Sequence, residues 1–197
     1  MENFVPLLVI GCIIWWIARR KKKRPQLQVG VKVNFRPNTP AENRISELHR
    51  QATAYKNEAN WDKAIACLRE AEKLKCGVEI IYPIKHALRL PLFLQQGGYF
   101  NEAMAEFQKL LDGTEERVLS WLPKRNISSK TMLIHADLMD IYQSMSTSCK
   151  REKLQALADE YTELAEKHKS QHAKLLKAEQ TRNSKKVTER REKRQTT

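Results

Sequence analysis

The sequence predicts an all-α fold in which an N-terminal transmembrane helix is followed by a short solenoid of helical hairpins and a long C-terminal helix. Three observations lead to this prediction. An uncharged apolar run, residues 4–18, is followed directly by six cations. One spacing of apolar residues occurs twice within residues 48–111, which is typical of stacked helical hairpins. Six glycines and seven prolines among 197 residues, with 30% charged residues, suit solvated helices better than a loop-rich or all-β fold.

The apolar run is predicted to be an uncleaved membrane anchor. A secretory signal peptide carries its positive charge before the apolar region, whereas here Glu2 comes first and the cations last. A buried core helix does not usually end in six consecutive cations. Fifteen helical residues span about 22 Å of a hydrocarbon layer of about 30 Å, and snorkelling cations with local thinning can cover the difference. Trp15 and Trp16 fall where an interfacial aromatic belt would lie.

The cations after the run orient the chain in the membrane. Because Lys and Arg beside a span stay in the cytoplasm, we expect the N-terminus to face outward and residues 19–197 to be cytoplasmic. The same cations can attract anionic lipid headgroups at the membrane interface. They are Arg19, Arg20, Lys21, Lys22, Lys23 and Arg24. The four cysteines form no C-x-x-C pair, which agrees with free thiols in a reducing compartment.

Residues 25–39 are predicted to be a linker. Apolar and polar residues alternate from Leu27 to Phe35, so the segment is either a single strand or an extended tether. It ends at Thr39, which forms a capping box with Glu42 at the start of the first soluble helix. The chain is therefore divided into an anchor with a basic cluster at 1–24, the linker at 25–39, a helical domain at 40–168, and a basic helix end with a disordered tail at 169–197.

Two hairpins are predicted in the first part of the helical domain. Their helices are expected at residues 40–57, 61–75, 83–96 and 101–111. Asn60 can cap the second helix, and Pro91 should kink or break the third. Gly97 and Gly98 form the turn of the second hairpin, and Gly113 follows its last helix.

A degenerate third hairpin is predicted in the remainder, since at least three such units are generally needed to bury a continuous core. A short helix within 114–126 precedes it, and its own helices cover 130–145 and the chain from Lys150 onward. The buried face of the last helix is expected to comprise Leu154, Leu157, Ala158, Tyr161, Leu164 and Ala165. From Arg182 the chain is polar and charged, and we expect it to be disordered.

The two passes of the pattern resemble the tetratricopeptide (TPR) repeat. The matching residues are Tyr55, Ala64, Leu68 and Ala71 in the first pass and Gly98, Phe100, Ala103 and Phe107 in the second. The resemblance implies a scaffold that binds proteins or peptides and performs no chemistry. In such stacks the first helix of each hairpin lines a concave groove, which here would contain His49, Thr53, Lys56, Lys85, Arg89, Leu92 and Gln95. Cations on this face suit an acidic peptide or a C-terminal carboxylate, and an ordinary solvated helix face is the alternative.

The layout also resembles the lipopolysaccharide-assembly TPR proteins of bacterial inner membranes, which place an anchor and an Arg/Lys cluster before their repeats. This resemblance implies a single-pass inner-membrane protein and leaves a regulatory role in envelope assembly open as a minor alternative. The C-terminal metal-binding module of that family, with its paired C-x-x-C motifs, has no counterpart in this sequence.

The net charge of +13 belongs to the two ends of the chain. Residues 1–24 carry +5 and residues 169–197 carry +7, which leaves +1 for the helical middle. The basic ends keep binding of RNA or anionic lipid open as an alternative function, although no aromatic residue follows Tyr161 to stack on bases. A homodimer through the C-terminal helix is also left open. Its seam would consist of Leu154, Leu157, Tyr161 and Leu164.

No catalytic or cofactor-binding motif is present in the sequence, so we expect no enzyme activity, no cofactor and no metal. His168 and His172 have the i,i+4 spacing of a helical metal pair, but the sequence shows no third ligand beside them. His135 with Asp137 or Asp140 lacks a nucleophile. The predicted function is a non-catalytic, membrane-anchored TPR-like adaptor that binds a protein partner at the cytoplasmic face.

Overall fold

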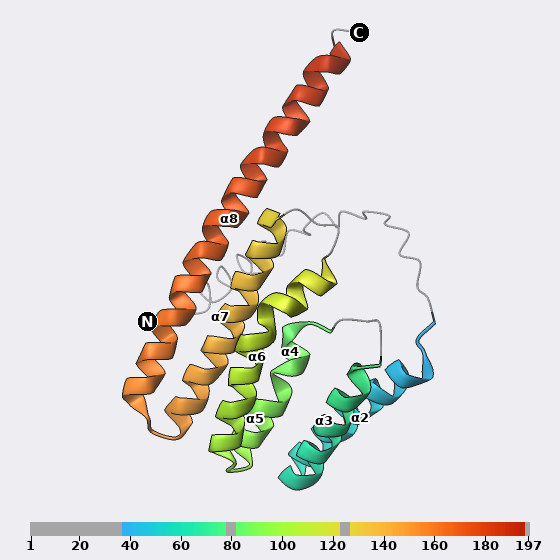
Figure 1. Ribbon diagram of the computed structural model, residues 1–197, viewed down its shortest axis with the longest axis vertical. Coiled ribbons are helices and arrows are strands. Elements are labelled where there is room, and N and C mark those ends of the chain that lie inside the picture. Colours follow the sequence, from blue (N-terminus) through green and yellow to red (C-terminus); the bar gives the residue numbers. More distant parts are fainter. Residues whose placement is uncertain (1–36, 78–81, 123–126, 196–197) are drawn as a thin grey trace, which may run out of the picture. The chain divides into compact units, whose positions relative to one another are not determined.

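The computed structural model describes residues 37–77, 82–122 and 127–195, and the regular structure in these ranges is entirely α-helical (Figure 1). To that extent the predicted all-α fold is confirmed. The chain divides into two units, Met1–Pro37 and Asn38–Thr197, and every helix described below belongs to the second. Within the described ranges, no helix combines the length and the apolar character that crossing a bilayer requires. The predicted anchor and the alternating segment of the linker lie outside those ranges.

The first hairpin has the predicted boundaries. It consists of α2 (Pro40–Asn57) and α3 (Trp61–Lys75). The Thr39 amide donates to the Glu42 carboxylate at 2.8 Å, and the Glu42 amide donates to the Thr39 hydroxyl at 3.3 Å, which completes the capping box. The Asn60 side chain accepts from the Lys63 amide at 3.4 Å, as a helix cap should.

The second hairpin begins with a broken helix, but the break is not at Pro91. It falls at Leu88, between α4 (Ile84–Ala87) and α5 (Arg89–Gln96). A proline ring clashes with the carbonyl four residues earlier, which here is that of Ala87, so the disturbance lies one turn before the proline. Pro91 itself is buried in the first turn of α5. Backbone amides in the first turn of a helix have no intrahelical partner, so α5 loses no hydrogen bond through the missing amide of the proline.

The return helix of this hairpin, α6 (Phe100–Trp121), continues through Gly113 instead of ending at residue 111. Among the described glycines only Gly98 has a positive φ, 88°, and it forms the predicted turn before α6. Thr114 and Val118 lie buried on the following turns, and the Thr114 hydroxyl donates to the Leu110 carbonyl at 2.6 Å. Their burial outweighs the low helix propensity of a single glycine.

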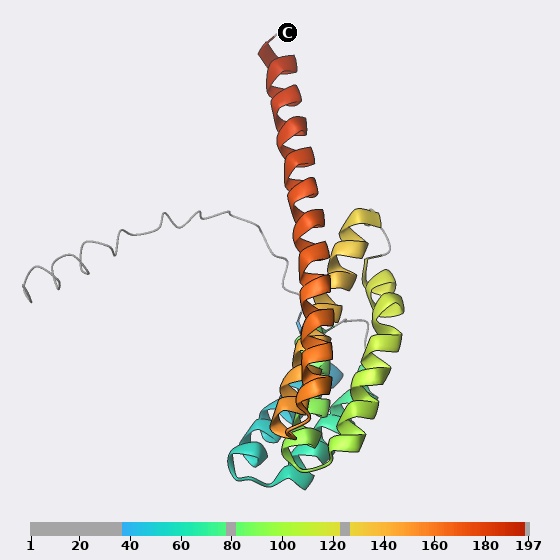
Figure 2. The same ribbon diagram turned by 90° about the vertical axis from the view of Figure 1, so that its left-hand side faces the viewer.

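The third hairpin consists of α7 (Ile127–Arg151) and α8 (Gln155–Gln195). It turns at residues 152–154, where Lys153 has a φ of 61° and the Leu154 amide donates to the Cys149 carbonyl at 3.0 Å. The last helix therefore begins five residues later than expected. It also extends past Arg182, where we expected disorder, and projects beyond α7 (Figure 2). Residues 182–195 contain no glycine or proline and are rich in Arg, Lys, Glu and Gln, which favour helix.

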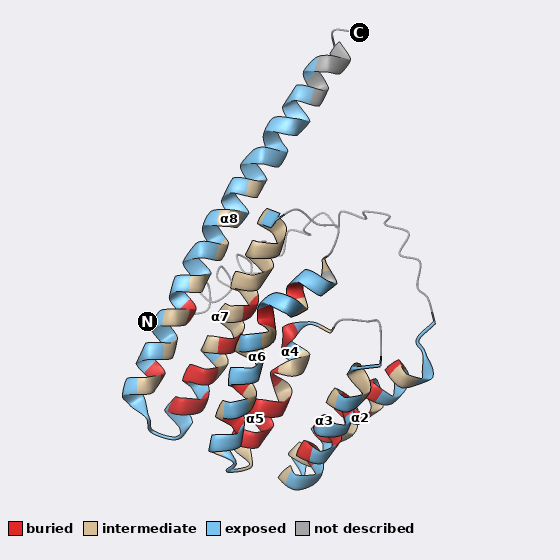
Figure 3. Ribbon diagram, in the orientation of Figure 1, coloured by how far each residue is buried: buried red, intermediate tan, exposed pale blue. Residues whose placement is uncertain are grey.

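The buried residues form two clusters between successive helices (Figure 3). One joins α2, α3, α5 and α6, and the other joins α4, α6 and α7. Ala64 and Ala103 are both fully buried, as expected for small residues where helices cross closely. The helices pack in chain order, with α2 on α3, α3 on α5, α5 on α6, α6 on α7 and α7 on α8. This order is solenoid-like, and α8 packs on α7 of the same chain. Leu154, which was predicted to lie on the buried face of the last helix, is instead exposed in the turn before α8.

Candidate partner-binding surface

Arg89, the first residue of α5, ties α5 to α2. Its guanidinium Nη2 donates to the Thr53 hydroxyl at 2.7 Å and to the His49 carbonyl at 3.0 Å. Its Nη1 lies 3.0 Å from His49 Nδ1. Three of the residues predicted to line the groove therefore meet in space, and the contact joins the first helices of two successive hairpins.

The charge of Arg89 is not balanced by a carboxylate within the described part of the chain, where none of the ion pairs includes it. Partial burial disfavours the charged guanidinium and lowers the pKa of Arg89. Its guanidinium carbon lies 5.4 Å from the centre of the Phe93 ring, and the Lys56 ammonium lies 5.3 Å from the same ring centre. Two cations share one aromatic ring here, so an anionic partner would find both charges fixed in place.

His49 supports Arg89 from below the surface. It was expected to line the groove, but only 6% of it is exposed. Burial, followed by the charges of Lys75, Arg89 and His86, lowers the pKa of His49 to about 4. Its ring meets that of His86 edge-on at a centroid distance of 5.1 Å. His49 is therefore a neutral, buried side chain that positions Arg89 and does not itself face a partner.

A hollow of about 460 Å³ lies between α4–α5 and α7. Its lining residues are Lys85, Leu88, Leu92, Asp140, Gln143, Ser144, Thr147 and Arg151. Two leucines provide an apolar wall, and two cations face one carboxylate. We call the surface formed by this hollow and the Arg89 contact the inner face. Its residues are Thr53, Lys56, Lys85, Leu88, Arg89, Leu92, Asp140, Gln143, Ser144, Thr147 and Arg151.

Gln95 is the second predicted groove residue that is buried. Its amide nitrogen donates to the Glu152 carboxylate at 2.9 Å, and its amide oxygen accepts from Arg151 Nη1 at 3.0 Å. Gln95 thus connects α5 to the turn after α7 and holds Arg151 at the edge of the hollow. The α7 side of the hollow was missed from the sequence. One sequence pattern could have indicated this side, because four polar residues are spaced four, three and four positions apart and therefore share one face of a helix. They are Asp140, Ser144, Thr147 and Arg151.

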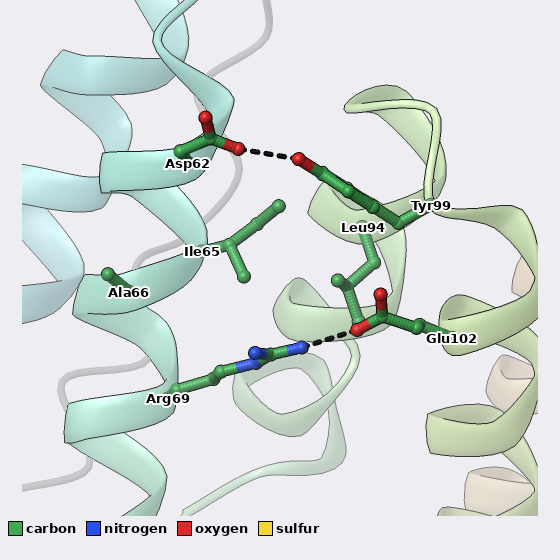
Figure 4. Close-up of a pocket in the computed structure, with 7 residues that line it drawn as sticks. All are labelled: Asp62, Ile65, Ala66, Arg69, Leu94, Tyr99 and Glu102. Carbon is green, nitrogen blue, oxygen red and sulfur yellow. Dashed lines mark hydrogen bonds and ion pairs between the residues drawn. The ribbon is translucent and has the colours of Figure 1, made fainter.

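A smaller hollow of about 310 Å³ lies between α3 and α6 (Figure 4). The Tyr99 hydroxyl donates to Asp62 at 2.7 Å across one end, and Arg69 pairs with Glu102 at 2.5 Å across the other. The remaining lining residues are Ile65, Ala66 and Leu94. Because its polar groups pair with one another, this hollow presents no unpaired group to a ligand, and it is a weaker candidate than the inner face.

His135 and Asp137 do not form an acid–base pair. Asp137 is buried and accepts from the guanidinium of Arg117 on α6. His135 Nδ1 instead lies 2.9 Å from His168 Nδ1 on α8. Neither Arg117 nor His168 was predicted as a partner, because each lies 20 or more positions away in the sequence, on another helix.

Other predicted sites have a mixed outcome. Cys67, Cys76 and Cys149 are free thiols. In the described ranges, no three or more His, Cys, Asp or Glu side chains are placed together so as to hold a metal ion. The predicted membrane-interface residues lie outside those ranges. They are Trp15, Trp16, Arg19, Arg20, Lys21, Lys22, Lys23 and Arg24.

Comparison of the chain with protein-family models, with curated proteins and with solved structures finds no match. The TPR resemblance therefore stays a prediction that rests on the repeated residues.

Proposed function

We propose that the chain is a membrane-anchored, TPR-like adaptor that binds an acidic segment of a protein partner on its inner face, without catalysis. Arg89 is the observation that carries the proposal. It is a partly buried guanidinium, fixed by contacts to His49 and Thr53, and it has no carboxylate among the described residues. A desolvated cation held in one orientation gains more from an anionic partner than a mobile surface cation does.

The rest of the inner face supports the same class of partner. Its cations are Lys56, Lys85, Arg89 and Arg151, and its one acidic residue is Asp140. Leu88 and Leu92 give the hollow an apolar wall beside these charges. A segment with one apolar side chain flanked by Asp or Glu residues matches this arrangement, since the apolar group provides burial and the carboxylates provide orientation.

The membrane location in this proposal comes from the sequence. The uncharged run at residues 4–18 and the cations after it favour an N-terminal anchor with the helical domain in the cytoplasm, as in a bacterial inner membrane. Anchoring would confine the partner to the membrane surface. In a fractionation experiment the protein should stay in the membrane pellet through a carbonate wash, and release by salt alone would exclude an embedded anchor.

The groove proposal is tested with the full-length protein. Affinity capture from membranes identifies the partner, and a synthetic peptide of its acidic segment is then titrated by fluorescence anisotropy. Arg89→Met and Lys85→Ala should each weaken binding, the former by at least about 10-fold, or about 1.4 kcal/mol. Lys109→Ala is the matched control, because Lys109 is an exposed cation on α6 that pairs with Glu106. Equal binding by all four proteins would overturn the proposal.

A second candidate function is binding of RNA or anionic lipid through the basic ends. The exposure of every residue from 180 to 189 on α8 favours it, because these side chains have no packing role. Deleting residues 182–197 should abolish such binding and leave peptide binding intact. If the deletion abolishes partner capture and the Arg89 and Lys85 changes do nothing, the adaptor proposal fails in favour of the basic end.

A further inference from the structure

A further hollow, of about 330 Å³, lies between α7 and α8. Met139 and Ala165 are apolar residues in its lining, and the remaining lining residues are polar or charged. Two of the polar ones, Gln143 and Thr147, also line the hollow of the inner face between α4–α5 and α7. Both are exposed residues of α7. The two hollows therefore adjoin across one ridge of α7, and a chain that lies in the first can continue into the second.

The hydroxyl groups at this ridge have no proton left to donate to a ligand. The Thr147 hydroxyl donates to the Gln143 carbonyl at 2.9 Å, and the Thr162 hydroxyl donates to the Ala158 carbonyl at 2.8 Å. Because the proton of Thr162 is used in this way, its 2.8 Å contact with Ser146 is a hydrogen bond that Ser146 donates. All three hydroxyl oxygens can then only accept from a ligand. They suit the backbone N–H groups of a peptide and do not suit an anion.

Two other side chains at the ridge are able to donate. The side-chain amide of Gln143 makes no hydrogen bond within the described ranges, and it can both donate to and accept from a peptide group. Lys150 is exposed and has no acidic partner in the described part of the chain, whereas Lys169 pairs with Glu166 at 2.9 Å. The hollow thus offers one uncompensated positive charge beside groups that match an extended main chain.

We propose that the partner segment of the inner face continues across α7 in an extended conformation and places a second acidic side chain beside Lys150. This inference rests on the proposed function, in which Arg89 and Leu92 bind the first, acidic and apolar part of the segment. Gln143 and Thr147 pair with its main chain at the ridge. One helix is about 10 Å across, and an extended chain advances by about 3.3 Å per residue. The second acidic residue therefore follows the apolar one by about three or four positions.

A continuing peptide suits this hollow better than nucleic acid or a second copy of the chain. Nucleic acids contact proteins mainly through phosphate oxygens, which only accept hydrogen bonds, and so do the hydroxyls of Ser146, Thr147 and Thr162 in this arrangement. A second copy would bring another basic end close to this one, since residues 169–197 carry a charge of +7. An acidic peptide has N–H groups for the hydroxyls and a carboxylate for Lys150.

The test uses the full-length protein in detergent and amidated synthetic peptides that carry fluorescein. Each peptide has an Asp-Asp-Leu core followed by alanines, with one glutamate placed one to six positions after the leucine. In anisotropy titrations the wild type should bind most tightly at a spacing of three or four, by about 3- to 5-fold over the peptide without glutamate. Lys150→Ala should remove this gain and leave the affinity for the core peptide unchanged, and Gln143→Ala should reduce the gain. Lys174→Ala is the matched control, because Lys174 is an exposed cation of α8 outside the hollow.

The continuation and the inner face fail in different ways. If Arg89→Met weakens the core peptide but the position of the glutamate has no effect, or if Lys150→Ala keeps the gain, only the continuation across α7 is overturned. Absence of Arg89-dependent binding of any peptide overturns both. A change of oligomeric state in Lys150→Ala, with every peptide affinity unchanged, would assign the hollow to a second copy and overturn the continuation.

A photo-crosslink tests the same path on the unmodified protein. A peptide with benzoylphenylalanine directly after the glutamate, at a spacing of three, should attach to Met139 or to another lining residue of the hollow between α7 and α8. Mass spectrometry of the digested adduct locates the attachment. Attachment confined to α4 and α5 would mean that the peptide stops at the first hollow, which would also overturn the continuation.

Discussion

Arg89 fixes the tautomer of His49. A guanidinium can only donate, so the 3.0 Å contact between Arg89 Nη1 and His49 Nδ1 makes Nδ1 the acceptor and places the ring proton on Nε2. That Nε2 is buried and has no hydrogen-bond partner among the described residues. Protonating His49 would break the contact with Arg89 and put a second positive charge beside the guanidinium. The surface cation and the buried ring beneath it are therefore coupled.

The first prediction concerns acid stability. The pKa of His49 is about 4 in the folded chain, against about 6.5 for an unperturbed histidine. His49 therefore binds its proton more tightly in the unfolded state than in the folded state. The contribution of neutral His49 to folding stability is complete above about pH 6.5, and it is lost as the pH falls toward 4. The loss should be on the order of 2 kcal/mol in urea unfolding free energy. His49→Gln should flatten this dependence, and an unchanged pH slope in that variant would contradict the assignment to His49.

The second prediction concerns the buried ion pair of Arg117 and Asp137. Asp137→Leu leaves a largely buried guanidinium without its carboxylate, and two of its nitrogens, Nε and Nη1, already lack partners in the described structure. We expect a loss of about 3–5 kcal/mol in unfolding free energy. The double variant Arg117→Met with Asp137→Leu should recover most of this loss, because it removes both charges together. Additive losses in the double variant would show that the pair acts mainly through packing.

The third prediction compares Gly113, which lies inside α6, with Gly98, which lies in the turn just before that helix. Gly113 lies inside α6 with open space around its Cα, so Gly113→Ala should stabilise the protein by about 0.5–1 kcal/mol. Gly98 has equally open surroundings but a φ of 88°, so Gly98→Ala should destabilise it by about 1 kcal/mol or more. Thermal unfolding of both variants gives the comparison. The same sign of change at both positions would refute this explanation, which depends on backbone conformation alone.

The fourth prediction concerns the crossing of α3 with its neighbours. Ala64 is fully buried in α3, and Ala66, two residues along, is exposed. Ala64→Leu should cost about 1–3 kcal/mol in unfolding free energy because the core is filled around it. Ala66→Leu should change stability by less than about 0.5 kcal/mol. A loss of less than about 1 kcal/mol for Ala64→Leu would mean that α3 and its neighbours α2 and α5 do not approach closely at this residue.

Boundaries set by local chemistry were predictable, and boundaries set by tertiary packing were not. The first hairpin followed from the Thr39 and Asn60 caps, whose hydrogen bonds involve residues only three apart. Gly113 gave a false helix end, because burial of Thr114 keeps α6 intact. The turn after α7 carries no glycine, so the positive φ of Lys153 could not be foreseen.

The candidate surface was predictable to the extent that the repeat pattern assigns helix faces. It placed Thr53, Lys56 and Arg89 on one face, and the structure brings these residues together. It could not show that His49 and Gln95 are buried, because their depth depends on how neighbouring hairpins stack. The repeat pattern also could not predict that Asp140 lines the hollow beside α5 or that His135 contacts His168. In both cases the neighbouring residues are far away in the sequence.

The 41 residues of α8 are one continuous helix with unequal support. Its first part packs on α7, whereas every residue from 180 to 189 is exposed. A lone helical segment shorter than about 12–15 residues is marginal in water, so the last turns should open and re-form independently of the domain. Backbone amide protons there should exchange with solvent almost freely, while those beside α7 should exchange only when the whole hairpin opens. Protection of the backbone amide protons from exchange would then decrease along α8 from its first part, beside α7, to its C-terminal end.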